Sequence, residues 1–207
     1  MTDLLGFLTP DQFLTFLIGG LVVNIAPGAD VVLATACGIQ GGPRAGAMSG
    51  LGTGFGVLWH IALAAAGVAA LIAAHPGALD VLRWIGAGYL VWLAVKAWNA
   101  GPAGAARGQA DLWRAFRKGA LTNVLNPKPV LFILAFLPQF VVPGGPPVWQ
   151  QIAVLGLTFA FTGTLVTMGY GIAAGYAGQA LARRMGALNR VAAVLFAGLA
   201  ARLALDG

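Results

Sequence analysis

The chain has 207 residues, of which 59% are hydrophobic and 9% are charged, and it contains no glutamate. Soluble domains carry roughly 25% charged residues, so this composition excludes an ordinary soluble domain and predicts an integral membrane protein. The net charge of +6 comes from basic residues in short tracts between apolar blocks. That pattern indicates loops beside anionic lipid rather than a nucleic-acid surface.

Apolar segments long enough to cross the hydrocarbon core, which takes about 20 residues, recur along the whole chain. We expect an all-α membrane protein that forms one domain over residues 1–207. The N-terminus has no basic region, so the first segment is expected to be retained rather than cleaved. The six predicted spans are Phe13–Ile39, Ala47–Ala74, Leu79–Trp98, Ala120–Val142, Trp149–Ala177 and Ala187–Leu205.

The first span contains an interruption, "VVNIAPGADVV", in which Asn24, Pro27, Gly28 and Asp30 separate two apolar arms. Proline removes a backbone donor and clashes with the preceding helical turn. Unwound backbone inside a membrane is tolerated only where it is buried in protein or lines a cavity. We therefore predict a break in this helix, with a carboxylate beside it.

The second span opens with glycine at every fourth residue, and a second glycine row lies two residues along. Such rows let helix backbones approach closely, either inside the protomer or at a homodimer contact. The two rows are Gly42, Gly46, Gly50 and Gly54, and Gly52 and Gly56. His60, later in this span, is interpreted as a hydrogen-bonded packing residue, with a proton-relay role as the alternative. The only cysteine, Cys37, is read as a small buried apolar residue.

Basic residues give the expected orientation. Nine of the twelve lysines and arginines follow spans one, three and five, so those loops are placed in the cytoplasm and both termini outside. The longest connection is a cytoplasmic basic loop over residues 100–118, whose Trp113 and Phe116 are expected at the interface. The nine residues are Arg44, Lys96, Arg107, Arg114, Arg117, Lys118, Arg183, Arg184 and Arg190.

The fourth span contains a matching interruption, "NVLNPKPVLF", with Asn126, Pro127 and Lys128. A shift of 100 residues places Pro27 on Pro127. An odd number of spans in each half requires the halves, about 1–99 and 119–207, to cross in opposite directions. We therefore predict a 3+3 inverted repeat with broken helices one and four, the arrangement that marks binding sites in secondary transporters.

Asp30 and Lys128 are the carboxylate and the ammonium placed deep in the predicted spans, and such groups tend to pair with one another. We expect the two breaks to face each other, so that substrate groups replace the pair or a proton neutralises Asp30. The structural alternatives are a fixed salt bridge, or Asp30 as a helix N-cap. Asn24 and Asn126 offer amides either to a ligand or to the freed backbone, and each proline could merely kink its helix.

Several motifs together resemble the lysine exporter (LysE) family of amino-acid translocators over essentially the whole chain. They are Pro27-Gly28-Ala29-Asp30, the glycine-rich start of span two, "WIGAGYLVWLAVKAW" and "FRKGALTNVLNPKPVLF". The family has a second proline where this chain has Ala29, which affects the geometry of the first break. The resemblance implies six spans and efflux of amino acids from the bacterial cytoplasm, driven by the membrane potential or protons.

The sequence therefore predicts a multi-pass inner-membrane exporter of small zwitterionic metabolites, with no enzymatic activity, cofactor, metal or nucleic-acid partner. A passive channel is the main alternative, because a sequence does not separate leak from coupled movement. A redox or haem-anchoring subunit would need paired histidines or a cysteine cluster in the spans, where only His60 is available. A hydrolase would need a positioned nucleophile, and no such pattern occurs.

Overall fold

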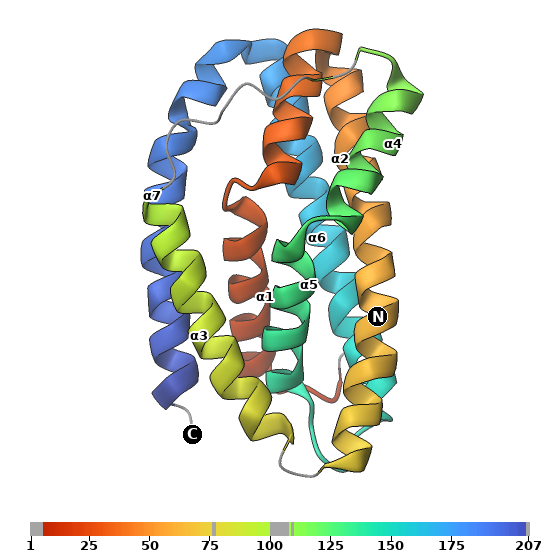
Figure 1. The fold of residues 1–207 in the computed structure, drawn as a ribbon, viewed down its shortest axis with the longest axis vertical. Coiled ribbons are helices and arrows are strands. Elements are labelled where there is room, and N and C mark those ends of the chain that lie inside the picture. Colours follow the sequence, from red (N-terminus) through yellow and green to blue (C-terminus); the bar gives the residue numbers. More distant parts are fainter. Residues whose placement is uncertain (1–5, 76–77, 100–107, 109, 206–207) are drawn as a thin grey trace.

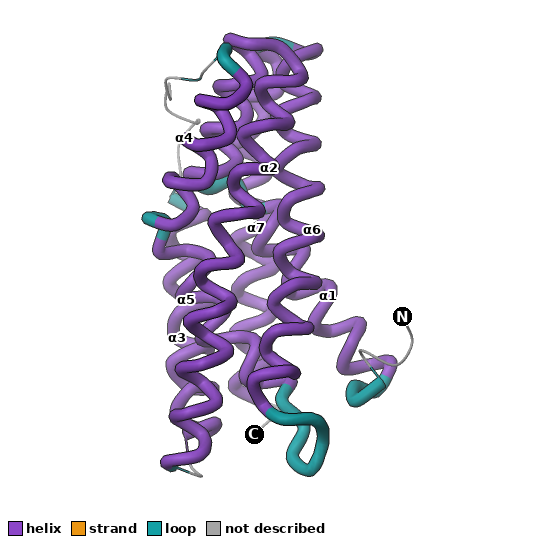
Figure 2. The backbone as a smooth tube through the Cα atoms, turned by 90° about the vertical axis from the view of Figure 1, so that its right-hand side faces the viewer, coloured by secondary structure: helices purple, strands orange, loops and turns teal. Residues whose placement is uncertain are grey.

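The computed structural model describes residues 6–75, 78–99, 108 and 110–205, and within these ranges every regular element is a helix. The helices run along one long axis (Figures 1 and 2). Of the expected loop 100–118, residues 100–107 and 109 lie outside the described part. The elements are α1 (Pro10–Ile25), α2 (Ala29–Ala74), α3 (Ala78–Trp98), α4 (Leu112–Val124), α5 (Pro127–Phe136), the 3₁₀ helix η1 (Leu137–Phe140), α6 (Val148–Ala177) and α7 (Gln179–Leu205).

The first predicted break is present. Helix α1 begins with a capping box in which the Thr9 hydroxyl and the Gln12 side chain each accept a backbone N–H, and it ends at Ile25. Ala26, Pro27 and Gly28 are non-helical, and α2 starts at Ala29. The helix continues past Ala29 without a second proline.

Helix α2 consists of two arms. At 46 residues it would be roughly 70 Å long if straight, more than twice the thickness of a hydrocarbon core. Gly42 interrupts it with φ 76° and ψ 179°, a conformation open to glycine, and Pro43 follows. Figure 1 shows the ribbon rising to the top and returning downward from there. Residues 29–42 thus complete the first predicted span, and residues 43–74 contain the second.

The second predicted break is also present, but its first half begins earlier than expected. Asp111 caps α4 by accepting a hydrogen bond of 2.7 Å from the Arg114 amide, so the helix starts at Leu112 instead of Ala120. Trp113 and Phe116, assigned to the interfacial loop, therefore lie on α4, where their rings stack. Helices α4 and α5 with η1 form a pair bent by 50° at the break.

Both glycine rows pack inside the protomer. A Cβ on Gly50 would approach backbone atoms of Met168 in α6 to 2.6 Å, and Gly46 lies equally close to Gly171. Gly52 and Gly56, in the second row, meet the α4 backbone in the same way. Gly42 has open space around it and belongs to the turn rather than to the packing row. The rows therefore need no dimer contact, and the homodimer stays a prediction.

Hydrophobic length tests the six predicted spans only in part. Ala29–Leu71 and Val148–Ala177 are long and apolar enough to cross a membrane, and the bent pair of α4 with α5 and η1 would make a third. Helix α1, with 16 residues, is shorter than a full crossing and depends on residues 29–42 to complete one. The protein is all-helical in its described part, and its apolar helices are those of a membrane protein.

Candidate functional site

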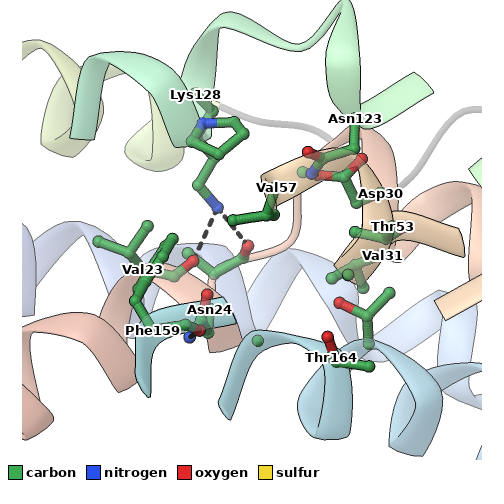
Figure 3. Close-up of a pocket in the computed structure, with 16 residues that line it drawn as sticks. Val23, Asn24, Asp30, Val31, Thr53, Val57, Asn123, Lys128, Phe159 and Thr164 are labelled. Carbon is green, nitrogen blue, oxygen red and sulfur yellow. Dashed lines mark hydrogen bonds between the residues drawn. The ribbon is translucent and has the colours of Figure 1, made fainter. Parts of the chain in front are cut away.

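The side chain of Lys128 donates hydrogen bonds to backbone carbonyls at the first break. In a continuous helix the carbonyl of Val23 would accept the N–H of residue 27, but Pro27 has none. The ammonium of Lys128, which comes from α5, donates instead to the Val23 carbonyl at 2.8 Å and to the Ala26 carbonyl at 2.7 Å (Figure 3). A cation at the C-terminal end of α1 also interacts favourably with the helix dipole.

At the second break the arrangement is reversed: a side chain from the first half of the chain donates a hydrogen bond to the backbone of the second half. Pro127 removes the i+4 donor of the Asn123 carbonyl, which accepts the Asn126 backbone amide at 2.9 Å and, in addition, His60 Nε2 at 3.0 Å. His60 is 4% exposed, so the interpretation of a hydrogen-bonded packing residue agrees with its position. Asn126 caps α5 by accepting the Lys128 amide at 3.0 Å. Asn126 therefore serves the freed backbone, one of its two expected roles.

Asp30 lies in the first turn of α2, whose N-cap is Gly28, so the alternative of Asp30 as the N-cap is wrong. One carboxylate oxygen, Oδ2, accepts the amide of Asn126 at 2.9 Å and the amide of Asn123 at 3.1 Å. Asp30 and Lys128 thus have separate hydrogen-bonding partners in place of the direct ion pair that the sequence suggested. The carboxylate is bound from across the break, by amides of the second half.

Asn24 connects the first break to α6. Its amide donates to the Phe159 carbonyl at 3.3 Å and to the Thr162 hydroxyl at 3.1 Å. Two tyrosine hydroxyls stabilise the surrounding backbone: Tyr170 donates to the Ile25 carbonyl at 3.0 Å, and Tyr89 to the Lys128 carbonyl at 3.1 Å. The broken ends of α1 and α5 are therefore positioned by side chains from α3 and α6.

Two cavities adjoin the breaks. The larger one, which we call the chamber, has a volume of about 380 Å³ and lies between the breaks, α3 and α7. Both prolines line it, as do Gly28 and Asn126. The smaller one, which we call the inner cavity, has a volume of about 40 Å³ and is lined by Asn24, Asp30, Asn123 and others (Figure 3). Lys128 and Gly28 border both cavities, so the expected residues gather around two adjoining spaces.

The charged and polar groups that line the two cavities determine which ligand groups they favour. Gly28 caps α2 without a side-chain bond, so the first amides of that helix face the breaks as a partial positive charge. Lys96 and Lys128 add cations to the chamber wall. The inner cavity contains the carboxylate of Asp30. Within the described residues no group of three or more His, Cys, Asp or Glu side chains could hold a metal ion.

Sequence reasoning missed several polar residues of these cavities, among them Thr53 and Thr164 of the inner cavity. Asn123 is 1% exposed and was overlooked, although it precedes Asn126 by only three residues and lies on the α4 side of the same break. Lys96 was assigned to a cytoplasmic tract, but α3 ends near the height of the breaks, and Lys96 lines the chamber (Figure 1). Asn189 lies within α7, which begins at Gln179 instead of Ala187. The sequence carried a signal only for Asn123.

Comparison with known proteins adds independent information. The family model described as LysE type translocator matches residues 21–207. The chain is 31% identical to a homoserine/homoserine lactone efflux protein of Salmonella typhi over 95% of this chain and 98% of the relative. It is 35% identical to an uncharacterized membrane protein of Vibrio cholerae over 76% and 78%, and 30% identical to a leucine efflux protein of Klebsiella pneumoniae over 93% and 94%. No solved structure matches the chain.

Proposed function

Because the chain belongs to the family of LysE type translocators, we propose that it is a secondary-active exporter of amino acids or similar small zwitterionic metabolites. The observation that carries this proposal is the junction of the two broken helices. Pro27 and Pro127, which lie 100 residues apart in the sequence, line one chamber of about 380 Å³, with Lys128 between it and the carboxylate of Asp30. A space of that size suits a small amino acid.

The names of the relatives reduce the number of candidate substrates. Homoserine and leucine are neutral amino acids, and the similar proteins that carry these names cover nearly the whole chain. The chamber has a cationic lining, with Lys96 and Lys128. A neutral cargo can present its carboxylate to these groups and to the uncapped N-terminus of α2, whereas a cationic side chain would be repelled. We therefore assign the protein to neutral amino acids.

The proposed topology is a single membrane domain of six crossings, built as two inverted repeats of about 1–99 and 119–207. In support, α1 with residues 29–42 runs up the long axis, whereas α4 with α5 runs down it (Figure 1). We place the protein in the bacterial inner membrane with both termini outside. The end of the molecule that carries Arg44, Arg114 and Lys118 then faces the cytoplasm.

Each expected site residue has a proposed role. Asp30 and Lys128 hold the opposite charges of the cargo or alternate between cargo and their present partners. Pro27, Gly28 and Pro127 keep the backbone open, while Asn24 and Asn126 position it. Protonation of Asp30 would remove the negative charge of the inner cavity. Asp30 would then be the group through which the proton gradient or the membrane potential drives export.

The test is uptake of radiolabelled leucine and homoserine into inverted membrane vesicles energised by respiration. We expect uphill accumulation in the wild type and a loss of at least tenfold with Asp30→Asn and with Lys128→Ala, at matched amounts of inserted protein. Gly169→Ala is the matched control, because Gly169 has open space around it on α6. Full rates in both charge variants would overturn the site, and accumulation that stops at equal concentrations would identify a passive channel.

A further inference from the structure

Two side chains that line the inner cavity have oxygen atoms without hydrogen-bond donors. Asp30 Oδ1 and Asn123 Oδ1 are both buried, and neither has a partner in the part of the chain that the structure describes. Their neighbouring atoms are engaged with each other, since Asn123 Nδ2 donates to Asp30 Oδ2 at 3.1 Å. Buried acceptors without a donor cost free energy, so this cavity is adapted to a guest that donates hydrogen bonds.

Two threonine hydroxyls of this cavity donate their protons to backbone carbonyls. The Thr53 hydroxyl donates to the Ser49 carbonyl at 3.2 Å, and the Thr164 hydroxyl donates to the Ala160 carbonyl at 2.7 Å. Both threonines line the inner cavity and therefore offer it oxygen lone pairs. The cavity thus combines a carboxylate, an amide oxygen and two hydroxyl oxygens, all as acceptors.

The size and charge of the cavity restrict the guest. About 40 Å³ holds a group with one or two heavy atoms, but not a whole amino acid. A carboxylate with three neutral oxygens favours a cationic donor. The ammonium of a zwitterion brings its own carboxylate, which can face Lys128, so the pair of charges is matched.

We propose that Asp30, Asn123, Thr53 and Thr164 form the subsite for the primary ammonium group of the cargo. This assignment rests on the proposed function of amino-acid export. The ammonium enters the inner cavity, and the carboxylate lies toward Lys128. The side chain occupies the chamber, which shares the lining residues Ala26, Gly28 and Lys128 with the inner cavity. Recognition then requires a nitrogen that carries several N–H groups.

The experiment measures binding directly on the full-length protein in detergent or nanodiscs. Thermal unfolding is followed with increasing methylammonium chloride, tetramethylammonium chloride or sodium chloride at constant pH and ionic strength. We expect methylammonium to raise the unfolding temperature saturably and tetramethylammonium, which has no N–H, to have no such effect. Equal shifts from both organic cations would overturn the proposal, and the same saturable shift with sodium alone would reassign the site to a metal ion.

Variants connect the effect to these oxygens. Thr53→Val keeps the shape and Asn123→Leu keeps approximate size, and each should weaken methylammonium at least tenfold. Ser49→Ala is the control, because its hydroxyl is buried without a hydrogen-bond partner, as Asn123 Oδ1 is, but Ser49 does not line the cavity. An unchanged methylammonium affinity in Thr53→Val and Asn123→Leu would contradict the assignment.

This result is separable from the vesicle experiment. Uptake that depends on Asp30, without methylammonium binding, would support the proposed exporter and contradict the ammonium subsite. Saturable methylammonium binding without amino-acid uptake would support the ammonium site and contradict the proposed export of amino acids. Within the uptake assay, N-acetylleucine, which keeps the carboxylate but has no ammonium group, should fail to compete with labelled leucine.

Discussion

At the scale of single residues, the side chains of one half satisfy the backbone that the other half leaves open. Lys128 donates to the Val23 carbonyl, whose helical donor Pro27 removes, and His60 donates to the Asn123 carbonyl together with the Asn126 backbone amide. Neither side chain reaches its partner unless the two breaks lie together. The polar residues of the site therefore have a structural role, and their proposed functional role needs a separate measurement.

Replacement of Lys128 by methionine tests the structural role. The change keeps the length of the side chain but leaves the carbonyls of Val23 and Ala26 without a donor. We expect a loss of about 2 kcal/mol in the free energy of unfolding, measured by reversible denaturation in mixed micelles. Lys96→Met is the matched control: it removes the contact of that ammonium with the Trp92 ring, which is worth about 0.5–1 kcal/mol. Equal losses of unfolding free energy in the two variants would show that the hydrogen bonds from Lys128 contribute no more to stability than the contact between Lys96 and Trp92.

His60→Gln distinguishes a positioning role from a proton relay. Glutamine keeps an N–H donor for the Asn123 carbonyl but does not titrate. We expect uptake to stay within about threefold of the wild type, with the same pH profile. His60→Phe, which removes the donor, should reduce both uptake and stability. A loss of proton dependence in His60→Gln alone would identify the relay instead.

At the scale of the elements, close glycine contacts join the two halves. Helix α2 packs most extensively against α6 and α4, and α3 packs against α7. Gly46 of α2 and Gly171 of α6 lie so close that neither has room for a methyl group. Because these contacts involve backbone, the helices cannot yield by moving a flexible side chain.

Gly46→Ala therefore should separate α2 from α6 at a cost of about 3 kcal/mol, seen as a lower unfolding temperature and a lower yield of folded protein. Gly169→Ala on α6 is the control, since nothing lies within contact distance there and alanine is the better helix former. That control should be neutral or slightly stabilising. A neutral Gly46→Ala would show that the helices do not pack this closely in the membrane.

The sequence was sufficient to predict both breaks, because proline removes a donor wherever it lies in a helix. It could not predict the partner of Lys128, since that depends on the register between α1 and α5. The earlier start of α4 was missed because the polar residues before Ala120 resemble a loop until Asp111 is recognised as a cap. Asn123 was missed despite its position three residues before Asn126, because the sequence does not show which carboxylate lies across the break.

At the scale of the whole molecule, the account predicts a fixed orientation. The turn at Gly42 and the turn around Pro143 lie at opposite ends of the long axis (Figure 1). In a Cys37→Ala background, a cysteine at Gln40 should react only with reagents that enter the cytoplasm. A cysteine at Pro143 should react with impermeant maleimide in intact spheroplasts. Labelling of both from the same side would contradict the six-crossing topology.

The central claim is that the cargo binds where the two broken helices meet, and protection of a cysteine at Ala29 tests it most directly. Ala29 lines the chamber at the first turn of α2, next to Gly28. In the Cys37→Ala background, saturating leucine or homoserine should slow thiol modification of Ala29→Cys at least fivefold. The same cargo should leave Gln40→Cys unaffected. An unchanged rate at Ala29→Cys, with a cargo that the same protein demonstrably transports, would contradict the account.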